Sequence, residues 1–269
     1  MIYTNGSDID LGRYKRFFAF GCSFTGYRWP TWADLLAHSN SKMEYINMAR
    51  SGAGQLFIIA QLNQCINHYN IGKDDLVGIM WSTFYREDRY LYHRRSDNWS
   101  TPGNIFTARH EVPQEFVDEY VCTRGMFVRD LALIDTTMRM LEHSDFDSFA
   151  MMGVSPENQN WTAGLEPGAG PPVDDVINLY SRVDRNMMPS LLETQFPDGW
   201  DTCYRYWNEG LQDIHADYHP SVRQYAVYLK KLGFKLPEHT QNFVREEHDR
   251  LLNVTHENEL EFHSPCMIL

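Results

Sequence analysis

The chain has 269 residues and a net charge of −12, with 36 acidic side chains against 24 basic ones. This balance argues against a surface that coats nucleic acid, because such a surface needs a basic stripe. The five cysteines are widely spaced and include no Cys-x-x-Cys pair, which argues against a disulfide framework or a zinc knuckle and favours a reducing compartment. We expect neither a signal peptide nor a membrane span, since no long apolar run occurs.

The first third of the chain alternates between predicted strands and helices. Short apolar runs predict buried strands at 16–20, 44–49 and 75–81. Between them, a capping-box pattern from Thr31 to Asp34 opens a helix through about residue 38. Apolar residues at helical spacing predict a second helix over 56–69, which Gly72 stops. This alternation is typical of a parallel sheet with crossover helices.

The remainder of the chain is less regular. It predicts further helices at 122–142, 220–233 and 242–252, short helices within 173–200, a strand at 148–154 and a loop at 164–172. We therefore expect an α/β fold, a three-layer α/β/α sandwich with a mostly parallel, flavodoxin-like central sheet. The whole chain, 1–269, is interpreted as one such domain, with an insertion at about 82–147 and a helical tail at about 234–269.

Small and hydroxyl-bearing residues follow each of the first three predicted strands, at 21–25, 50–54 and 81–83. In open α/β sheets, ligands bind outside the carboxyl ends of the strands, so these loops are the expected site. Asp217 and His219 come just before the strong helix near the end of the chain. A hydroxyl nucleophile needs a base, a carboxylate to orient that base, and backbone N–H donors for the oxyanion. The chain supplies residues for all three roles.

Taken together and in this order, these motifs resemble those of the SGNH (GDSL-like) hydrolases over residues 16–233. Gly21-Cys22-Ser23 matches the first block of the family, with a cysteine in place of its acid. Asn47 to Gly52 keeps the spacing of the second block, and Asp217-Tyr218-His219 resembles the last, with one residue between acid and histidine instead of two. The resemblance implies an α/β sandwich enzyme, an esterase, lipase or acetyl esterase acting on carbohydrates.

The resemblance implies a role for each matching residue. Ser23 is the expected nucleophile, His219 its general base, and Asp217 the residue that orients His219. The backbone N–H groups of Ser23 and Gly52 are the expected oxyanion hole. The third block of the family carries an asparagine that this chain lacks, and Thr83 or Ser82 lies nearest its position with a hydroxyl that can donate one hydrogen bond.

The expected substrate is a small-molecule or glycan O-acyl ester, and we expect no cofactor, no metal, no nucleic-acid partner and no membrane. Arg86 and Trp81 are candidate substrate contacts, although an arginine at this position equally suits a surface salt bridge. The aromatic residues that follow position 89 suit either a lid or sugar-stacking surface or a protein interface.

Three other interpretations stay open. Cys22 is a rival nucleophile, although its place beside Ser23 favours a buried packing role. The alternating Asp213, His215, Asp217 and His219 would suit a metal-dependent hydrolase. Finally, the missing asparagine would suit a weakly active or inactive binding or structural protein. The opening motif also resembles viral and marine bacterial proteins of unknown role, so a virion-associated location stands beside a cytoplasmic one.

Overall fold

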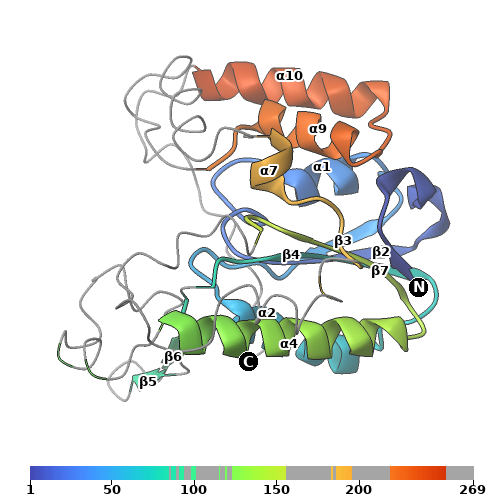
Figure 1. Ribbon diagram of the computed structural model, residues 1–269. Coiled ribbons are helices and arrows are strands. Elements are labelled where there is room, and N and C mark those ends of the chain that lie inside the picture. Colours follow the sequence, from blue (N-terminus) through green and yellow to red (C-terminus); the bar gives the residue numbers. More distant parts are fainter. Residues whose placement is uncertain are drawn as a thin grey trace.

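In the computed structural model, the described part of the chain forms a central sheet of five parallel strands (Figure 1). The structure describes residues 1–84, 86–88, 91–93, 98–100, 115, 119, 123–155, 183, 186–195 and 219–252. The strand order is β1 (Ile2–Tyr3), β7 (Asp147–Met152), β4 (Asp75–Trp81), β2 (Arg16–Phe20) and β3 (Glu44–Asn47). From β2 the chain moves outward to β3 and then crosses back to β4 on the other side of β2. This reversal decides where a site can form.

Both faces of the sheet are buried, because its strands carry apolar side chains on either side. All seven residues of β4 are buried, as are the last four of β2. In β2, Phe17 contacts Trp32 of one helical layer, with ring centroids 6.2 Å apart, whereas Phe18 contacts Tyr69 of the other at 5.3 Å. A parallel sheet needs such cover on both faces, and it accounts for the continuous apolar runs of these strands.

Helices cover the two faces as separate layers (Figure 1). One layer contains α1 (Trp32–His38), α7 (Leu191–Gln195), α9 (Val222–Lys231) and α10 (Glu238–Leu252). The other contains α2 (Gln55–Tyr69) and α4 (Thr123–Glu142). The predicted three-layer α/β/α sandwich with a parallel central sheet is thereby confirmed.

Local hydrogen bonds explain where the helices begin and end. At the start of α1, the Asp34 carboxylate accepts hydrogen bonds from the backbone N–H and the hydroxyl of Thr31, at 2.7 and 2.9 Å. Ser221 and Gln224 cap α9 reciprocally. The predicted stop of α2 at Gly72 was wrong, since the helix ends at Tyr69 and Asn70 adopts the left-handed conformation with φ of 48°. Asparagine tolerates this conformation because its short polar side chain can bond locally.

Several element boundaries differ from the expectation. The sequence patterns missed β1, which has two residues, and the antiparallel pair β5 (Leu91–His93) and β6 (Asn98–Ser100). The strand predicted at 44–49 ends at Asn47, and α10 begins at Glu238 instead of residue 242. The predicted loop at 164–172 and the tail beyond residue 252 lie outside the described residues.

Within the part of the chain that the structure describes, no helix combines the length and apolar character needed to cross a membrane.

Candidate active site

The topology of the sheet places two hydroxyl-bearing loops beside each other. The connections that leave β2 and β4 run to opposite sides, so a crevice is expected between the carboxyl ends of these two neighbouring strands. Ser23 follows β2 by three residues, and Ser82 and Thr83 follow β4 directly. The reversal of strand order therefore brings together two of the three loops that the sequence singled out.

A tight turn carries Ser23 at the end of β2. The Cys22 carbonyl accepts hydrogen bonds from the N–H groups of Thr25 and Gly26, at 2.9 and 3.1 Å. The turn brings Thr25 back over Gly21 so closely that a Cβ on Gly21 would lie 2.1 Å from the Thr25 hydroxyl oxygen. The indole N–H of Trp32 donates to that same hydroxyl at 3.1 Å. The glycine of this motif is thus required by the close approach of its own loop.

The two candidate nucleophiles in this turn differ in their surroundings. Cys22 is a free thiol, buried with 2% of its surface exposed, and it belongs to the hydrophobic core. Ser23 is 4% exposed, and its hydroxyl makes no hydrogen bond to any residue that the structure describes. The burial of Cys22 agrees with the packing role expected for it.

His219 packs against the loop that Ser23 opens. Its ring stacks on Tyr27, with centroids 3.8 Å apart and an interplanar angle of 12°, and meets the ring of Phe24, the residue after Ser23, edge-on at 5.3 Å. The buried indole N–H of Trp29 donates to the Pro220 carbonyl at 2.9 Å. The loop after β2 therefore carries the candidate nucleophile and also anchors the candidate base. Asp217 lies outside the described residues.

The second loop, which contains Gly52, adjoins the first. The Arg50 N–H donates to the Gly21 carbonyl at 3.2 Å, and the Asn47 side chain donates to the Thr25 carbonyl at 2.8 Å. Gly52 has a φ of 82°, which side-chain-bearing residues rarely adopt, and nothing lies within 4 Å of the position of a Cβ there. Gly52 thus combines a left-handed turn with open space beside its backbone.

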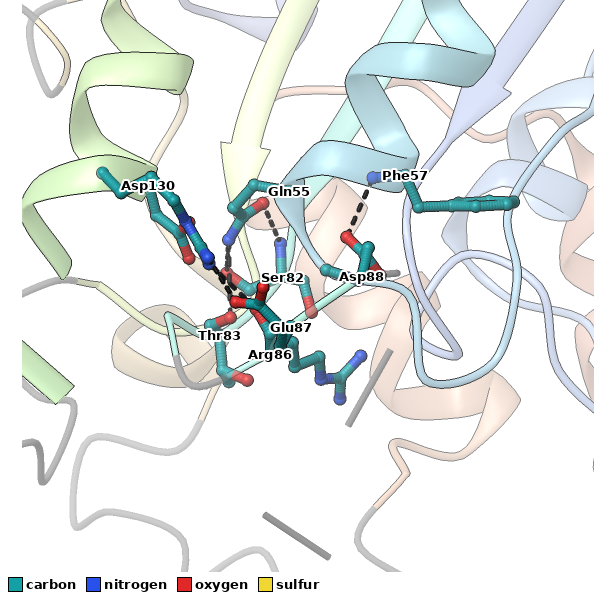
Figure 2. Close-up of polar contacts among 10 residues, drawn as sticks. Gln55, Phe57, Ser82, Thr83, Arg86, Glu87, Asp88 and Asp130 are labelled. Carbon is teal, nitrogen blue, oxygen red and sulfur yellow. Dashed lines mark hydrogen bonds and ion pairs between the residues drawn. The ribbon is translucent and has the colours of Figure 1, made fainter. Parts of the chain in front are cut away.

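The third loop is fixed to the second by side chains that the sequence analysis did not single out (Figure 2). The side-chain amide of Gln55 hydrogen-bonds both backbone groups of Ser82. Asp88, which is 5% exposed, accepts hydrogen bonds from the N–H groups of Gly54 and Phe57 at the start of α2, both at 2.8 Å. Burial raises the pKa of Asp88, although these two N–H donors oppose the shift.

Of the two candidate substrate contacts, Arg86 is half-buried and donates from Nη1 to the Ala53 carbonyl at 2.9 Å. Trp81 is fully buried, so its ring has no exposed surface in this structure. Ser82 is buried and its hydroxyl has no hydrogen-bond partner among the described residues, whereas Thr83 is half-buried.

A buried acid lies beside these loops on α4. Asp130 is fully buried, and Arg129 donates to its Oδ1 at 2.8 Å and also pairs with Glu87 (Figure 2). The sequence held a signal for Asp130, because it lies four residues after Met126 and four before Ile134 on the apolar stripe of the predicted helix. Asp88 offered no comparable signal, since it lies in a stretch without periodicity.

We expect the effect of Asp130→Asn on stability to depend on pH. The free energy of unfolding of the variant, measured against that of the wild type, is expected to be higher at pH 8 than at pH 5. Burial raises the pKa of the Asp130 carboxyl to about 7, so the folded state holds a proton that the unfolded state has released. The free energy of unfolding of the wild type therefore falls as the pH rises from about 4 to about 7. Between pH 5 and pH 8 the contribution of Asp130 to the free energy of unfolding of the wild type falls by about 2 to 3 kcal/mol. Urea unfolding of both proteins at the two pH values measures it.

Asp135→Asn is the matched control, because Asp135 lies on the same helix, is half-buried and pairs with the exposed Arg139. This variant removes a carboxylate from the same helix and leaves Asp130 in place, so the part of the pH dependence that Asp130 contributes is expected to remain. If the stability of Asp130→Asn shows the same pH dependence as that of the wild type, Asp130 is not protonated in the folded state at pH 5. Burial would then not raise the pKa of Asp130 as expected.

No metal site is formed by the described residues, among which no group of three or more His, Cys, Asp or Glu side chains is placed to hold an ion. Of the alternating segment that suggested a metal, only His219 is described, and Asp213, His215 and Asp217 lie outside.

A scan of protein-family models and a search of curated protein sequences found no match. Among solved structures, the chain is similar to the protein YXIM of Bacillus subtilis, with 13% identity and a TM-score of 0.42 over 88% of this chain and 56% of that one. It is also similar to LAE5, an alpha/beta hydrolase enzyme from the metagenome of Lake Arreo, Spain, with 14% identity and a TM-score of 0.42 over 81% of this chain and 95% of that one. A third similar structure is that of the acetyl xylan esterase AlAXEase, with 12% identity and a TM-score of 0.41 over 81% of this chain and 98% of that one.

The chain spans little more than half the length of the Bacillus protein. At these identities and TM-scores, the similarity assigns no activity to the chain. A functional assignment therefore rests on the geometry of its own residues.

Proposed function

We propose that the chain is a serine hydrolase of the SGNH type, which cleaves an O-acyl ester with Ser23 as nucleophile and His219 as general base. The packing of the His219 ring on Tyr27 and Phe24, inside the loop that Ser23 opens, carries this proposal. It places His219 against the loop that contains Ser23, and this loop follows β2, one of the two strands between which the strand order reverses and a ligand crevice is expected.

In the proposed reaction, the Ser23 hydroxyl attacks the ester carbonyl carbon while the His219 imidazole takes its proton. The tetrahedral intermediate collapses to an acyl-serine, and the leaving alcohol receives that proton from His219. Water then attacks the acyl-serine by the same route, which releases the acid and restores the Ser23 hydroxyl. Asp217 orients His219 and stabilises its charged form.

The oxyanion hole of the proposed enzyme combines the backbone N–H groups of Ser23 and Gly52 with the hydroxyl of Ser82 or Thr83. The open space beside Gly52 supports its part in this arrangement. A hydroxyl would replace the asparagine of the family, and the loss of one such donor typically costs on the order of 100- to 1,000-fold in rate. We therefore expect a modest turnover.

The proposed substrate is an O-acetyl ester on a carbohydrate or small molecule. Arg86 stays the candidate for a contact with an anionic group of that substrate, since only Nη1 of its guanidinium is committed to Ala53 among the described contacts. Acyl transfer to a sugar would use the same residues and differs only in the group that attacks the acyl-serine.

A covalent probe tests the proposal. The protein is treated with a fluorophosphonate, which reacts with activated serines, and the adduct is located by mass spectrometry of peptides. We expect one adduct on Ser23, with a parallel loss of para-nitrophenyl acetate hydrolysis. A wild-type protein that neither hydrolyses the ester nor takes up the probe would instead be a binding protein with this fold.

A further inference from the structure

One side chain, Gln55, spans the gap between the second and third strand-end loops (Figure 2). It is the first residue of α2 and is 1% exposed. Its Nε2 donates to the Ser82 carbonyl at 2.5 Å, and its Oε1 accepts from the Ser82 N–H at 3.2 Å. The amide thus hydrogen-bonds both polar backbone groups of one residue, as a neighbouring strand would.

This contact fixes the orientation of both partners. A backbone N–H only donates and a carbonyl only accepts, so the two bonds determine which end of the Gln55 amide faces which group of Ser82. Because the contact is buried, breaking it would leave polar groups without partners, which costs more than the bonds themselves contribute. The backbone of Ser82 is therefore held, and with it the direction in which its side chain leaves the loop.

The same two loops are joined a second time, from the opposite direction. Asp88 and Arg86, which follow Ser82 along the chain, bond to the backbone of Gly54, Phe57 and Ala53. Gln55, at the start of α2, bonds to the loop after β4, and the side chains of Arg86 and Asp88, which follow that loop, bond to the backbone at the start of α2. The two loops thus behave as one unit whose parts cannot shift independently.

We propose that Gln55 is a positioning residue for the oxyanion hole. Gln55 holds the loop after β4 in the position in which its hydroxyl donor and the Gly52 N–H can bind the same oxyanion. The inference rests on the proposed function above. Donors of an oxyanion hole act only when they are fixed in advance of the reaction, and a displacement of about 1 Å can cost on the order of 100-fold in rate. Loops are ordinarily mobile, so a donor that a loop carries needs a side chain such as Gln55 to fix it.

The chain provides a matched control on the same helix. Gln61 is also 1% exposed, and its amide atoms have no hydrogen-bond partner among the described residues. Gln55→Met and Gln61→Met remove the same amide from equally buried positions of α2, and only the first removes the contact with Ser82. Gln55→Glu is nearly isosteric, but it loses the donor and sets a carboxylate oxygen against the Ser82 carbonyl.

The variants are assayed for kcat and KM with para-nitrophenyl acetate, together with thermal unfolding to measure the folded fraction. For Gln55→Met we expect kcat to fall about 10- to 100-fold with KM changed less than about threefold, because a hole acts on the transition state. Gln55→Glu is expected to behave similarly, and it carries the test if the methionine variant does not fold. Gln61→Met is expected to stay within about twofold of wild type.

Four outcomes overturn the inference. A kcat that falls only in proportion to the folded fraction would make Gln55 a structural residue, and a raised KM with an unchanged kcat would make it a substrate contact. Wild-type kinetics in both Gln55 variants, with Ser23→Ala inactive, would refute this role and leave the proposed function standing. Wild-type rates in Ser23→Ala would refute both.

Discussion

Ser23→Ala is expected to lower the rate of para-nitrophenyl acetate hydrolysis at least about 1,000-fold, with little change in stability. The hydroxyl of Ser23 makes no hydrogen bond to a described residue, so its removal leaves no polar group of the described residues without a partner. The expected loss is therefore a loss of chemistry alone. Initial rates, corrected for the uncatalysed hydrolysis of this reactive ester, measure the effect, and urea unfolding checks the stability.

Cys22→Ala provides the comparison, because it removes the neighbouring nucleophile from the same turn. Cys22 is buried in the core, so this variant is expected to lose about 1 kcal/mol of stability and to keep its activity at temperatures where it is folded. The reverse pattern, with an active Ser23→Ala and an inactive Cys22→Ala, would move the nucleophile to the thiol and contradict the proposed mechanism.

Gly21→Ala is expected to lower the free energy of unfolding by about 3 kcal/mol and to abolish activity in the fraction that still folds. The added Cβ would lie 2.1 Å from the Thr25 hydroxyl oxygen and 3.0 Å from the Met80 carbonyl oxygen. Thr25 cannot easily move aside, because its hydroxyl accepts from the Trp32 indole and its carbonyl accepts from Thr31 and Asn47. Urea unfolding followed by circular dichroism measures the loss.

The same substitution at Gly72 serves as the control. A Cβ there would approach only the Asn70 carbonyl, at 3.9 Å, and Gly72 is not among the glycines with positive φ. Gly72→Ala should therefore change the free energy of unfolding by less than about 1 kcal/mol. Equal losses at the two positions would show that the turn after β2 can relax around a Cβ.

The parts of the fold that the sequence predicted are those with a strong local signal. The strands β2 and β4 are buried on both faces and therefore appear as continuous apolar runs, and the capping box of α1 lies within the four residues from Thr31 to Asp34. In contrast, β1 has two residues, too few to show a pattern, and it exists because β7 offers it a parallel partner. Tertiary pairing of this kind leaves no periodicity to detect.

The same distinction applies to the site. Ser23, Gly52 and His219 could be singled out because they belong to short motifs at the ends of elements, and strand order then predicts that they share one edge of the sheet. The contact of Gln55 with Ser82 joins residues 27 apart through a side chain that resembles any polar residue at the start of a helix. Its role becomes visible only when the two loops are seen side by side.

The anchoring of Pro220 by Trp29 has a mechanical consequence for the layer of helices above the sheet. Helix α9 begins two residues after Pro220, and both α1 and α10 pack against α9. Any displacement of the loop that contains Trp29 would therefore shift the first turn of α9 with it. The Trp29–Pro220 hydrogen bond in this way couples the position of the loop after β2 mechanically to the docking of α9 and of the helices packed on it.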